Sequence, residues 1–371
     1  MKRALRFIKK PKLVVDSKTM ISAHIIGSGI SGLTCALALY EAGCKVTLST
    51  ASNGPDETCC SWWAGGMLAP YCEQESAEPL IGKLGIESMS FWQALARTTD
   101  LQYHAKGTLV VASPRDQSLM RSFEKMTEHS QALNHSQIIE LEPDLNHFQR
   151  GLYYKDEAHI EPRLAVNVLW QKIEQSDITI KTNDFLDDTQ LRLSANQYDW
   201  QIDCRGLSAK NVLTDLRGVK GEMLHIFSSE VKLSRPVRLL HPRYPLYIVP
   251  RPNNEFMVGA TMIEANASKR ATVRSVLELL SAAYAVHPAF AEAEIVEIGV
   301  DARPAFDDNL PKIRRYANQV YVNGLYRHGY LAAPAVARRV VDLIIHDKLC
   351  SEVVDANYLE WQDNRNATNN A

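Results

Sequence analysis

Three glycines near the N-terminus, Gly27, Gly29 and Gly32, have the GxGxxG spacing that suits a turn around a phosphate group. The first permits a tight turn, the second lets the backbone approach a pyrophosphate, and the third permits close packing of a helix on a strand. N–H groups at the start of the following helix, at Ile30 and Ser31, would bind the phosphates with help from the helix dipole. The spacing predicts a dinucleotide site, and a turn with only a packing role is the alternative.

The residue that usually binds the adenosine ribose of a dinucleotide is missing. In such sites an Asp or Glu at the end of the second strand accepts the ribose hydroxyls. Here Ser49 and Thr50 occupy that place, and no arginine stands there for a 2′-phosphate. We expect the hydroxyl of Thr50 to substitute, or the carboxylate of Asp56 or Glu57 to reach back.

A βαβ unit must position these residues. An apolar strand at 23–26 precedes the glycines, apolar residues then recur with the period of a helix, and 45–48 alternates as a second strand. Downstream we expect a hairpin that turns at Asn253 and Asn254, and a helix that starts at Pro162, since proline suits the first helical turn. The remaining expected elements are strands at 108–112, 177–180, 200–203, 246–249, 256–259, 295–300 and 319–323, and helices at 162–173, 273–284 and 334–346.

Length and charge limit the class of protein. A chain of 371 residues has room for two domains, and a formal net charge of −2 argues against a nucleic-acid groove. Residues 1–20 carry seven Lys/Arg and one Asp, and we expect them to form a disordered basic leader. No apolar run approaches the ~18 residues of a membrane span. Seven cysteines without a CxxC pair argue against a metal site and favour a reduced, cytoplasmic protein.

A series of short motifs runs through the chain from residue 61 to residue 334. They are Ser61–Pro70, Gly151–Tyr153 with His159–Arg163, Gly221–Leu224, Tyr247–Arg251, Val258–Glu264, Arg303–Ala305, Asn323–Tyr330 and Leu331–Pro334. In this order they resemble the motifs of thiamine-pathway glycine oxidases, which belong to the D-amino-acid oxidase family of FAD-dependent flavoproteins. The resemblance covers residues 22–346.

The resemblance implies an α/β fold of mixed α+β character and FAD as the cofactor. A Rossmann-like FAD-binding domain would be interleaved with an antiparallel-sheet substrate-binding domain. We expect the former at 21–90, 150–218 and 296–350, the latter at 91–149 and 219–295, and a C-terminal tail at 351–371.

Four side chains match the family's substrate site. Arg303 matches its carboxylate-binding arginine, and a guanidinium suits this role because it binds a carboxylate bidentately and stays charged. Tyr247 matches a wall of the substrate pocket, Arg327 an arginine near the substrate, and Met262 a residue packed over the same cavity. We do not expect His328 to act as a base, because a neutral substrate amine needs none.

Further residues match the family's contacts with the flavin. The helix expected from Pro334 would direct its N-terminus at the N1–C2=O edge of the ring, where reduction places negative charge. Trp62 and Trp63 could instead be core residues or a stacking surface. The expected cofactor contacts are Ser61, Trp62, Ala64, Gly65, Gly66, Met67, Gly206, His328, Gly329, Tyr330 and Leu331.

The implied reaction is the oxidative deamination of glycine or a similar small amine to the imine and glyoxylate, with O2 reduced to H2O2. The implied protein is a cytoplasmic homo-oligomer without a membrane span or nucleic-acid partner, which hands the imine to a thiazole synthase for thiamine. Two alternatives stay open. One is a D-amino-acid dehydrogenase that passes electrons to a quinone, with the basic leader on an anionic membrane surface. The other is a flavoprotein that modifies a side chain of a partner protein.

Overall fold

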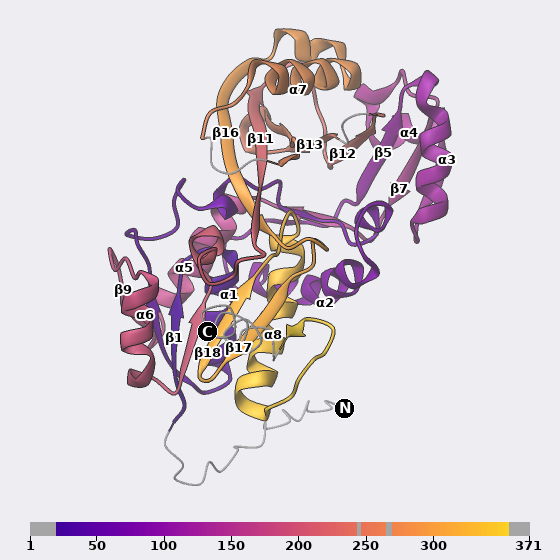
Figure 1. Ribbon diagram of the computed structural model, residues 1–371. Helices are drawn as coiled ribbons and strands as arrows, with labels where there is room; N and C mark the ends of the chain where they lie inside the picture. The colour runs from indigo at the N-terminus through magenta and orange to yellow at the C-terminus, as the bar shows by residue number, and fades with distance from the viewer. Residues whose placement is uncertain (1–19, 243–245, 265–268, 356–371) are drawn as a thin grey trace, which may run out of the picture.

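Two large β-sheets of different architecture make up the molecule, one in the lower and one in the upper half of Figure 1. The computed structural model describes residues 20–242, 246–264 and 269–355. Apart from Met20, the expected basic leader lies outside the described residues, as does the expected tail beyond residue 355.

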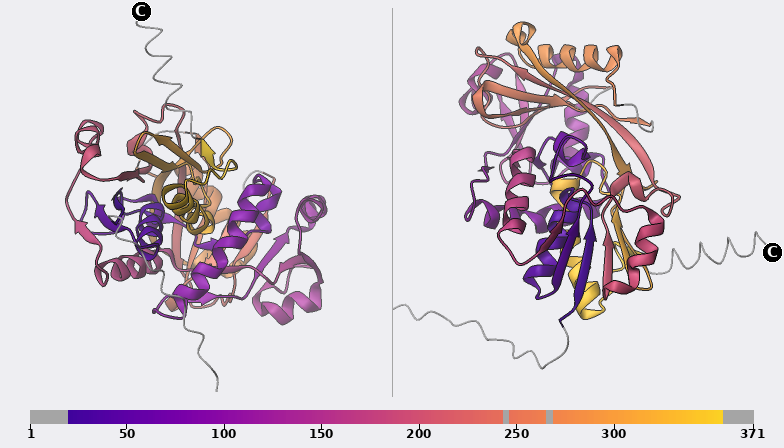
Figure 2. Two further views of the ribbon diagram at one scale, coloured as in Figure 1. Left: turned by 90° about the horizontal axis from the view of Figure 1, so that it is seen from below. Right: turned by 90° about the vertical axis from the view of Figure 1, so that its left-hand side faces the viewer.

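The lower sheet is mainly parallel and has the order β19-β17-β18-β10-β1-β2-β9. β1, β2, β9, β10 and β18 run parallel, so their carboxyl ends meet at one edge of the sheet, and only β17 pairs antiparallel with β18. Side chains of β1, β2, β10 and β18 share one hydrophobic core with helices α1, α2, α5 and α8, as expected for a covered parallel sheet. The ribbons in Figure 2 show helices around this sheet. The strands are β1 (Ser22–Ile26), β2 (Lys45–Ser49), β9 (Thr179–Lys181), β10 (Trp200–Asp203), β17 (Lys312–Tyr316), β18 (Gln319–Asn323) and β19 (Val354–Asp355), and the helices are α1 (Ile30–Glu41), α2 (Pro79–Ala96), α5 (Pro162–Glu174) and α8 (Gly329–His346).

The start of α8 corrects the expectation of a helix from Pro334. The helix begins at Gly329, so Pro334 lies inside it. Proline in a helix leaves the carbonyl four residues earlier without its N–H donor. Here that carbonyl belongs to Tyr330, and it accepts a hydrogen bond of 2.8 Å from the indole Nε1–H of Trp92 on α2. A side chain distant in sequence thus replaces the missing backbone bond, and the helix continues through the proline.

The upper sheet is mainly antiparallel and has the order β15-β11-β14-β13-β12-β5-β7-β6, with β16 also paired to β11. The expected hairpin is confirmed as β13 and β14, and Asn253 and Asn254 have positive φ angles of 62° and 60° at its turn. β12 and β5 form the one parallel pair of this sheet within the described part of the chain. The elements are β5 (Thr108–Ala112), β6 (Gln131–Asn134), β7 (Arg150–Tyr154), β11 (Arg217–Phe227), β12 (Val237–Leu240), β13 (Leu246–Pro250), β14 (Glu255–Gly259), β15 (Ile263–Glu264) and β16 (Glu294–Ala305), with α7 (Val273–Val286) packed on β11, β13 and β14.

The paired strands β11 and β16 join the two halves of the molecule. β11 has 11 residues and β16 has 12, and the two strands pair from end to end. They run from the upper sheet toward the lower one (Figure 1). β16 is longer than the strand expected at 295–300 and includes Arg303, so the arginine stands on a strand rather than after one. β7, within the range 150–218 that we assigned to the FAD-binding domain, pairs with β5 and β6 in the upper sheet.

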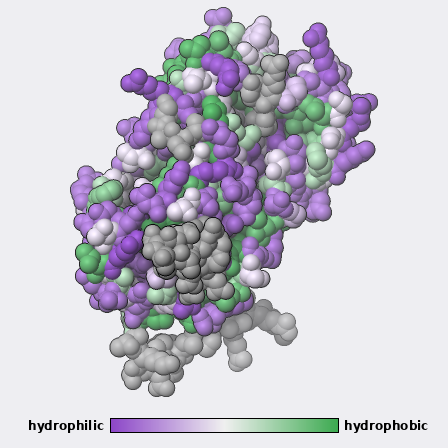
Figure 3. All heavy atoms as spheres, viewed as in Figure 1, coloured by the Kyte–Doolittle hydropathy of each residue, from purple (hydrophilic) through white to green (hydrophobic). Residues whose placement is uncertain are grey.

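The remaining elements are short and lie around these two sheets. The face of the molecule in Figure 3 is mostly hydrophilic, with hydrophobic side chains in small separate groups. None of the helices in the described ranges has the length and apolarity that crossing a bilayer requires.

The short elements around the two large sheets are the three-stranded sheet β3 (Met67–Leu68), β8 (Ala158–Ile160) and β4 (Tyr103–His104), and the helices α3 (Gln117–Met126), α4 (His135–Leu141) and α6 (Asp188–Ser194).

Candidate active site

A large cavity lies at the carboxyl ends of the parallel strands. The ends of β1, β2, β10 and β18 line it, together with residues of β11, β13, β14 and β16 from the upper sheet. This edge is where open α/β sheets bind their ligands. The space free of protein atoms, the open mouth included, is about 2120 Å³. All of the site residues expected from the sequence line this cavity except Gly32 and Trp62.

The glycine-rich turn at one end of the cavity has no room for side chains. A Cβ on Gly27, whose φ is +107°, would lie 2.8 Å from the carbonyl oxygen of Cys204. A Cβ on Gly32 would lie 1.8 Å from the carbonyl oxygen of Gly27, so Gly32 has the packing role of the third glycine. Gly29 is the N-cap of α1. The turn therefore fits the pyrophosphate of a dinucleotide such as FAD.

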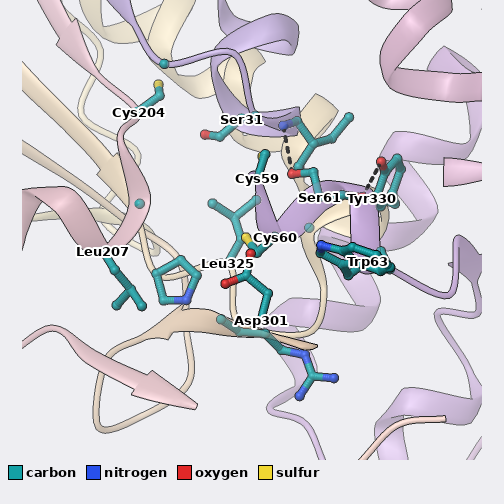
Figure 4. A pocket seen from close by; sticks show the side chains of 18 of the residues that line it. Ser31, Cys59, Cys60, Ser61, Trp63, Cys204, Leu207, Asp301, Leu325 and Tyr330 are labelled. Atoms are coloured by element: carbon teal, nitrogen blue, oxygen red, sulfur yellow. Dashed lines mark hydrogen bonds between the residues drawn. The ribbon is translucent and has the colours of Figure 1, made fainter. Parts of the chain in front are cut away.

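Ser61 connects the starts of two helices beside this turn (Figure 4). Its Oγ accepts a 3.0 Å hydrogen bond from the Ile30 N–H of α1, and its carbonyl accepts a 2.8 Å bond from the hydroxyl of Tyr330 on α8. Because Ser61 uses the Ile30 N–H, the N–H groups of Ser31 and Gly32 remain as the first-turn donors without an intrahelical acceptor.

A second helix start faces the same cavity. α8 begins at Gly329, and its N-cap residue His328 makes no side-chain cap to the helix. The N–H groups of Gly329, Tyr330 and Leu331 have no intrahelical acceptor, and all three residues line the cavity. Together with the helix dipole they favour negative charge at this place, which fits the N1–C2=O edge of a reduced flavin.

A buried carboxylate that the sequence did not reveal organises three of the expected site residues. Oε1 of Glu73 accepts hydrogen bonds from the Tyr247 hydroxyl (3.2 Å) and Arg327 Nη2 (3.3 Å), and Oε2 lies 2.9 Å from His328 Nε2. Burial alone would raise the pKa of the Glu73 carboxyl, but the charge of Arg327 and the hydrogen bond with His328 hold it well below its usual range. Burial lowers the pKa of His328, so a neutral imidazole donates its Nε2–H to Glu73.

Tyr247 is fixed from both sides. Its hydroxyl accepts a 3.0 Å hydrogen bond from Nη1 of the fully buried Arg238 and donates a hydrogen bond to Glu73. Burial also raises the pKa of the Tyr247 phenol well above its usual value, so the phenol stays protonated. In this arrangement Tyr247 forms a rigid wall of the cavity, and its proton is already engaged.

Arg303 lines the cavity and has no carboxylate partner among the described residues. Its Nη1 donates a 3.1 Å hydrogen bond to the Thr261 carbonyl, and it forms no ion pair within the described ranges. The guanidinium lies over Gly221, where a Cβ would stand 2.3 Å from Nη2, so a side chain there would displace it. Burial, together with the nearby charge of Arg327, lowers the pKa of Arg303 to about 10. Arg303 therefore stays charged at neutral pH and suits a small anion.

Met262 lies at the mouth of the cavity beside Arg327. Its sulfur accepts contacts from the Tyr326 hydroxyl at 3.3 Å and from Arg327 Nη1 at 3.4 Å, and the residue is 46% exposed. Met262 thus borders the mouth of the cavity, while Arg327 contacts both this sulfur and Glu73.

Two details differ from the sequence expectation. Trp63, rather than Trp62, lines the cavity, and the guanidinium of Arg163 lies 5.1 Å from both tryptophan rings. Asp301 stands two residues before Arg303 on the same face of β16 and also lines the cavity, and burial raises its pKa. One feature of the sequence could have pointed to Glu73 as a site residue: it lies three residues after the motif at 61–70.

Comparison with known proteins decides the class of this chain. Residues 23–343 match the family model described as DAO, FAD dependent oxidoreductase. The chain belongs to this family. The expected family, the mixed α/β fold and FAD as the cofactor of this FAD-dependent oxidoreductase are thereby confirmed, and the glycine-rich turn and the two helix starts fit that cofactor.

Individual relatives agree with the family. The oxidoreductase is 44% identical over 330 residues to a putative thiamine biosynthesis oxidoreductase ThiO of Rhizobium etli, covering 87% of this chain and 96% of that protein. It is 24% identical over 365 residues to a bifunctional protein ThiO/ThiG of Trichormus variabilis, covering 93% of this chain and 56% of that protein. The crystal structure of glycine oxidase from Geobacillus kaustophilus has the same fold, with a TM-score of 0.75 at 21% identity over 89% of this chain and 95% of that one.

Proposed function

We propose that this FAD-dependent oxidoreductase oxidises glycine, or an amine of similar size, to the imine, with O2 as the electron acceptor, and that it serves thiamine biosynthesis. The relatives from Rhizobium etli, a putative thiamine biosynthesis oxidoreductase, and from Geobacillus kaustophilus, a glycine oxidase, support this assignment. The observation that carries it is Arg303, a charged guanidinium in the cavity that has no carboxylate partner in the described part of the chain.

In this proposal the side chains bind and orient the substrate. Arg303 binds the substrate carboxylate, since a buried guanidinium gains most from a bidentate anion. Glu73 neutralises Arg327 and holds Tyr247 in place, so that Arg303 is the anchor. Apolar side chains that line the same cavity include Met223 and Met257, which favours a substrate with little beyond its carboxylate and amine. Bound FAD would supply the acceptor for the hydride of the α-carbon, which carries the two electrons of the oxidation.

His328 does not suit the role of a base for the substrate amine, because its Nε2 is bonded to Glu73 and burial lowers its pKa. In this proposal the amine reaches the reaction neutral, having lost its proton to water. The hydrolysed product balances as glycine + O2 + H2O → glyoxylate + NH3 + H2O2.

The purified protein, with its flavin confirmed by absorption, tests the proposal. We expect glycine to yield H2O2 and glyoxylate in equal amounts, and sarcosine and D-alanine measure how much volume the cavity accepts. Sluggish reoxidation of the reduced protein by O2 in a stopped-flow experiment, with fast reoxidation by a quinone, would instead support the dehydrogenase. A flavin-loaded protein that produces no peroxide from any small amine would support modification of a partner protein.

We also propose that the imine passes to a ThiG-type enzyme, the thiazole synthase expected from the resemblance. ThiO and ThiG parts joined in one chain in the Trichormus variabilis protein support such a coupling. Light scattering of the oxidoreductase alone, and then mixed with the ThiG protein of the same cell, measures both the expected homo-oligomer and the complex. Two independent species at all concentrations would contradict a direct hand-off.

A further inference from the structure

The end of β2 carries no charge where a dinucleotide site normally has its ribose-binding acid. Thr50 is buried, and its hydroxyl lies 2.7 Å from the hydroxyl of Ser28 in the glycine-rich turn. Asp56, an alternative expected from the sequence, uses Oδ1 to accept hydrogen bonds from the N–H and hydroxyl of Thr58. Thr50 therefore carries no charge, and Asp56, which also lines the cavity, turns Oδ1 back to its own loop.

The neighbouring strand supplies an acid at this place. β9 pairs parallel with β2, and the chain after β9 continues alongside β2: the Thr50 N–H donates to the Lys181 carbonyl (2.9 Å) and the Asp184 N–H to the Thr50 carbonyl (2.8 Å). Oδ2 of Asp184 accepts a 2.8 Å hydrogen bond from the Ser49 hydroxyl. The carboxylate is thus fixed at the end of β2 and lines the cavity, and a carboxylate has about four acceptor positions, of which Ser49 fills one.

The next residue adds an aromatic surface. Phe185 also lines the cavity and is 68% exposed, although phenylalanine rings are usually buried. An exposed phenyl ring beside a nucleotide site suits the face of a base, because stacking needs only two flat surfaces.

We propose that Asp184 accepts the ribose hydroxyls of the adenosine part of FAD and that Phe185 stacks on the adenine. The acid of this dinucleotide site then stands after β9 instead of at the end of β2. This inference rests on the FAD dependence of the family and is independent of the proposed substrate, since it concerns cofactor affinity alone.

FAD release from the holoenzyme tests the role of Asp184. On dilution, released FAD raises the flavin fluorescence, which gives the dissociation constant without any turnover. We expect Asp184→Asn, which keeps the acceptor for Ser49, to weaken FAD binding about 10- to 100-fold, as for lost hydrogen bonds to a charged group. Asp184→Glu should restore part of it. Asp56→Asn, in the same cavity wall, is the matched control and should change the affinity less than about twofold.

An FAD analogue with 2′-deoxyadenosine tests the contact even if a variant folds poorly. The wild-type holoenzyme is incubated with equal amounts of FAD and the analogue, and mass spectrometry identifies the flavin bound. We expect wild type to prefer FAD at least about tenfold and Asp184→Asn to lose this preference. Equal binding of both flavins by wild type, or an Asp56→Asn effect as large as that of Asp184→Asn, would overturn the role of Asp184.

The stacking part has its own variants. Phe185→Ala should weaken FAD binding by about five- to a hundredfold and Phe185→Tyr should retain it. An FAD dissociation constant for Phe185→Ala equal to that of wild type would overturn the stacking and leave the ribose contact standing.

Discussion

The Arg303→Gln substitution separates two opposite effects of a cation in the cavity that has no carboxylate partner in the part of the chain that the structure describes. In the substrate complex Arg303 binds the carboxylate, and losing such a charged contact costs about 2–5 kcal/mol. This corresponds to a fall of about 30- to 5000-fold in kcat/KM for glycine. In the free protein the same charge is unfavourable, because burial lowers the pKa of Arg303 from its ordinary value to about 10.

The stability effect can be worked from that pKa. A shift of this size corresponds to roughly 3 kcal/mol, and the contact of the guanidinium with solvent in the cavity reduces it to about 1–2 kcal/mol. We therefore expect Arg303→Gln to raise the unfolding temperature of the substrate-free protein, or leave it unchanged, while KM for glycine rises steeply. Circular dichroism melting and peroxide-coupled kinetics measure the two effects.

Arg327→Gln is the matched control, because this arginine has a partner. Removing it leaves the buried Glu73 carboxylate without its closest cationic neighbour, so the unfolding temperature should fall. An Arg303→Gln protein that melts lower than wild type and keeps its KM would refute the reasoning: Arg303 would then be a structural cation.

Three further predictions concern other parts of the site. Gly32→Ala should prevent retention of FAD, since its Cβ would overlap the Gly27 carbonyl, and a normal flavin spectrum after gel filtration would contradict this. Trp92→Phe should cost about 1–3 kcal/mol in urea unfolding, because it leaves the Tyr330 carbonyl freed by Pro334 unsatisfied; an unchanged free energy would show that another donor takes over. Burial depresses the pKa of His328, so its contribution to stability is present above pH 6.5 and declines below that pH as the unfolded chain binds a proton. His328→Asn should flatten this decline in unfolding temperatures measured between pH 7 and 5. An equal decline in the variant and in wild type would show that other groups cause it.

Local patterns in the sequence predicted the parts of the fold that local interactions determine. The βαβ unit follows from periodicity and glycine spacing, and the hairpin turn follows from two asparagines that tolerate positive φ. The start of α8 was mispredicted because the donor that compensates Pro334 stands on α2, 238 residues from its acceptor.

The candidate site likewise contains residues that the sequence predicted and residues that it did not. The glycine-rich segment and Arg303 belong to contiguous motifs, which a single sequence displays. Glu73 was missed because its partners Tyr247, Arg327 and His328 are 174 to 255 residues away, and only the fold brings them to one carboxylate. Asp184 was missed for a related reason: its place beside β2 depends on which strand becomes the neighbour in the sheet.

Ser61 has a consequence for the length of ligand that the protein can accept. The side chain of this residue bonds the first turn of α1, and its carbonyl bonds the first turn of α8. These two helices lie near opposite ends of the sequence. In bound FAD the first of these turns would bind phosphate and the second would lie at the ring system, so Ser61 fixes the separation between the two anion-favouring helix starts. A flavin that has the ring system but no phosphate, such as riboflavin, would reach only one of them and would gain less stabilisation.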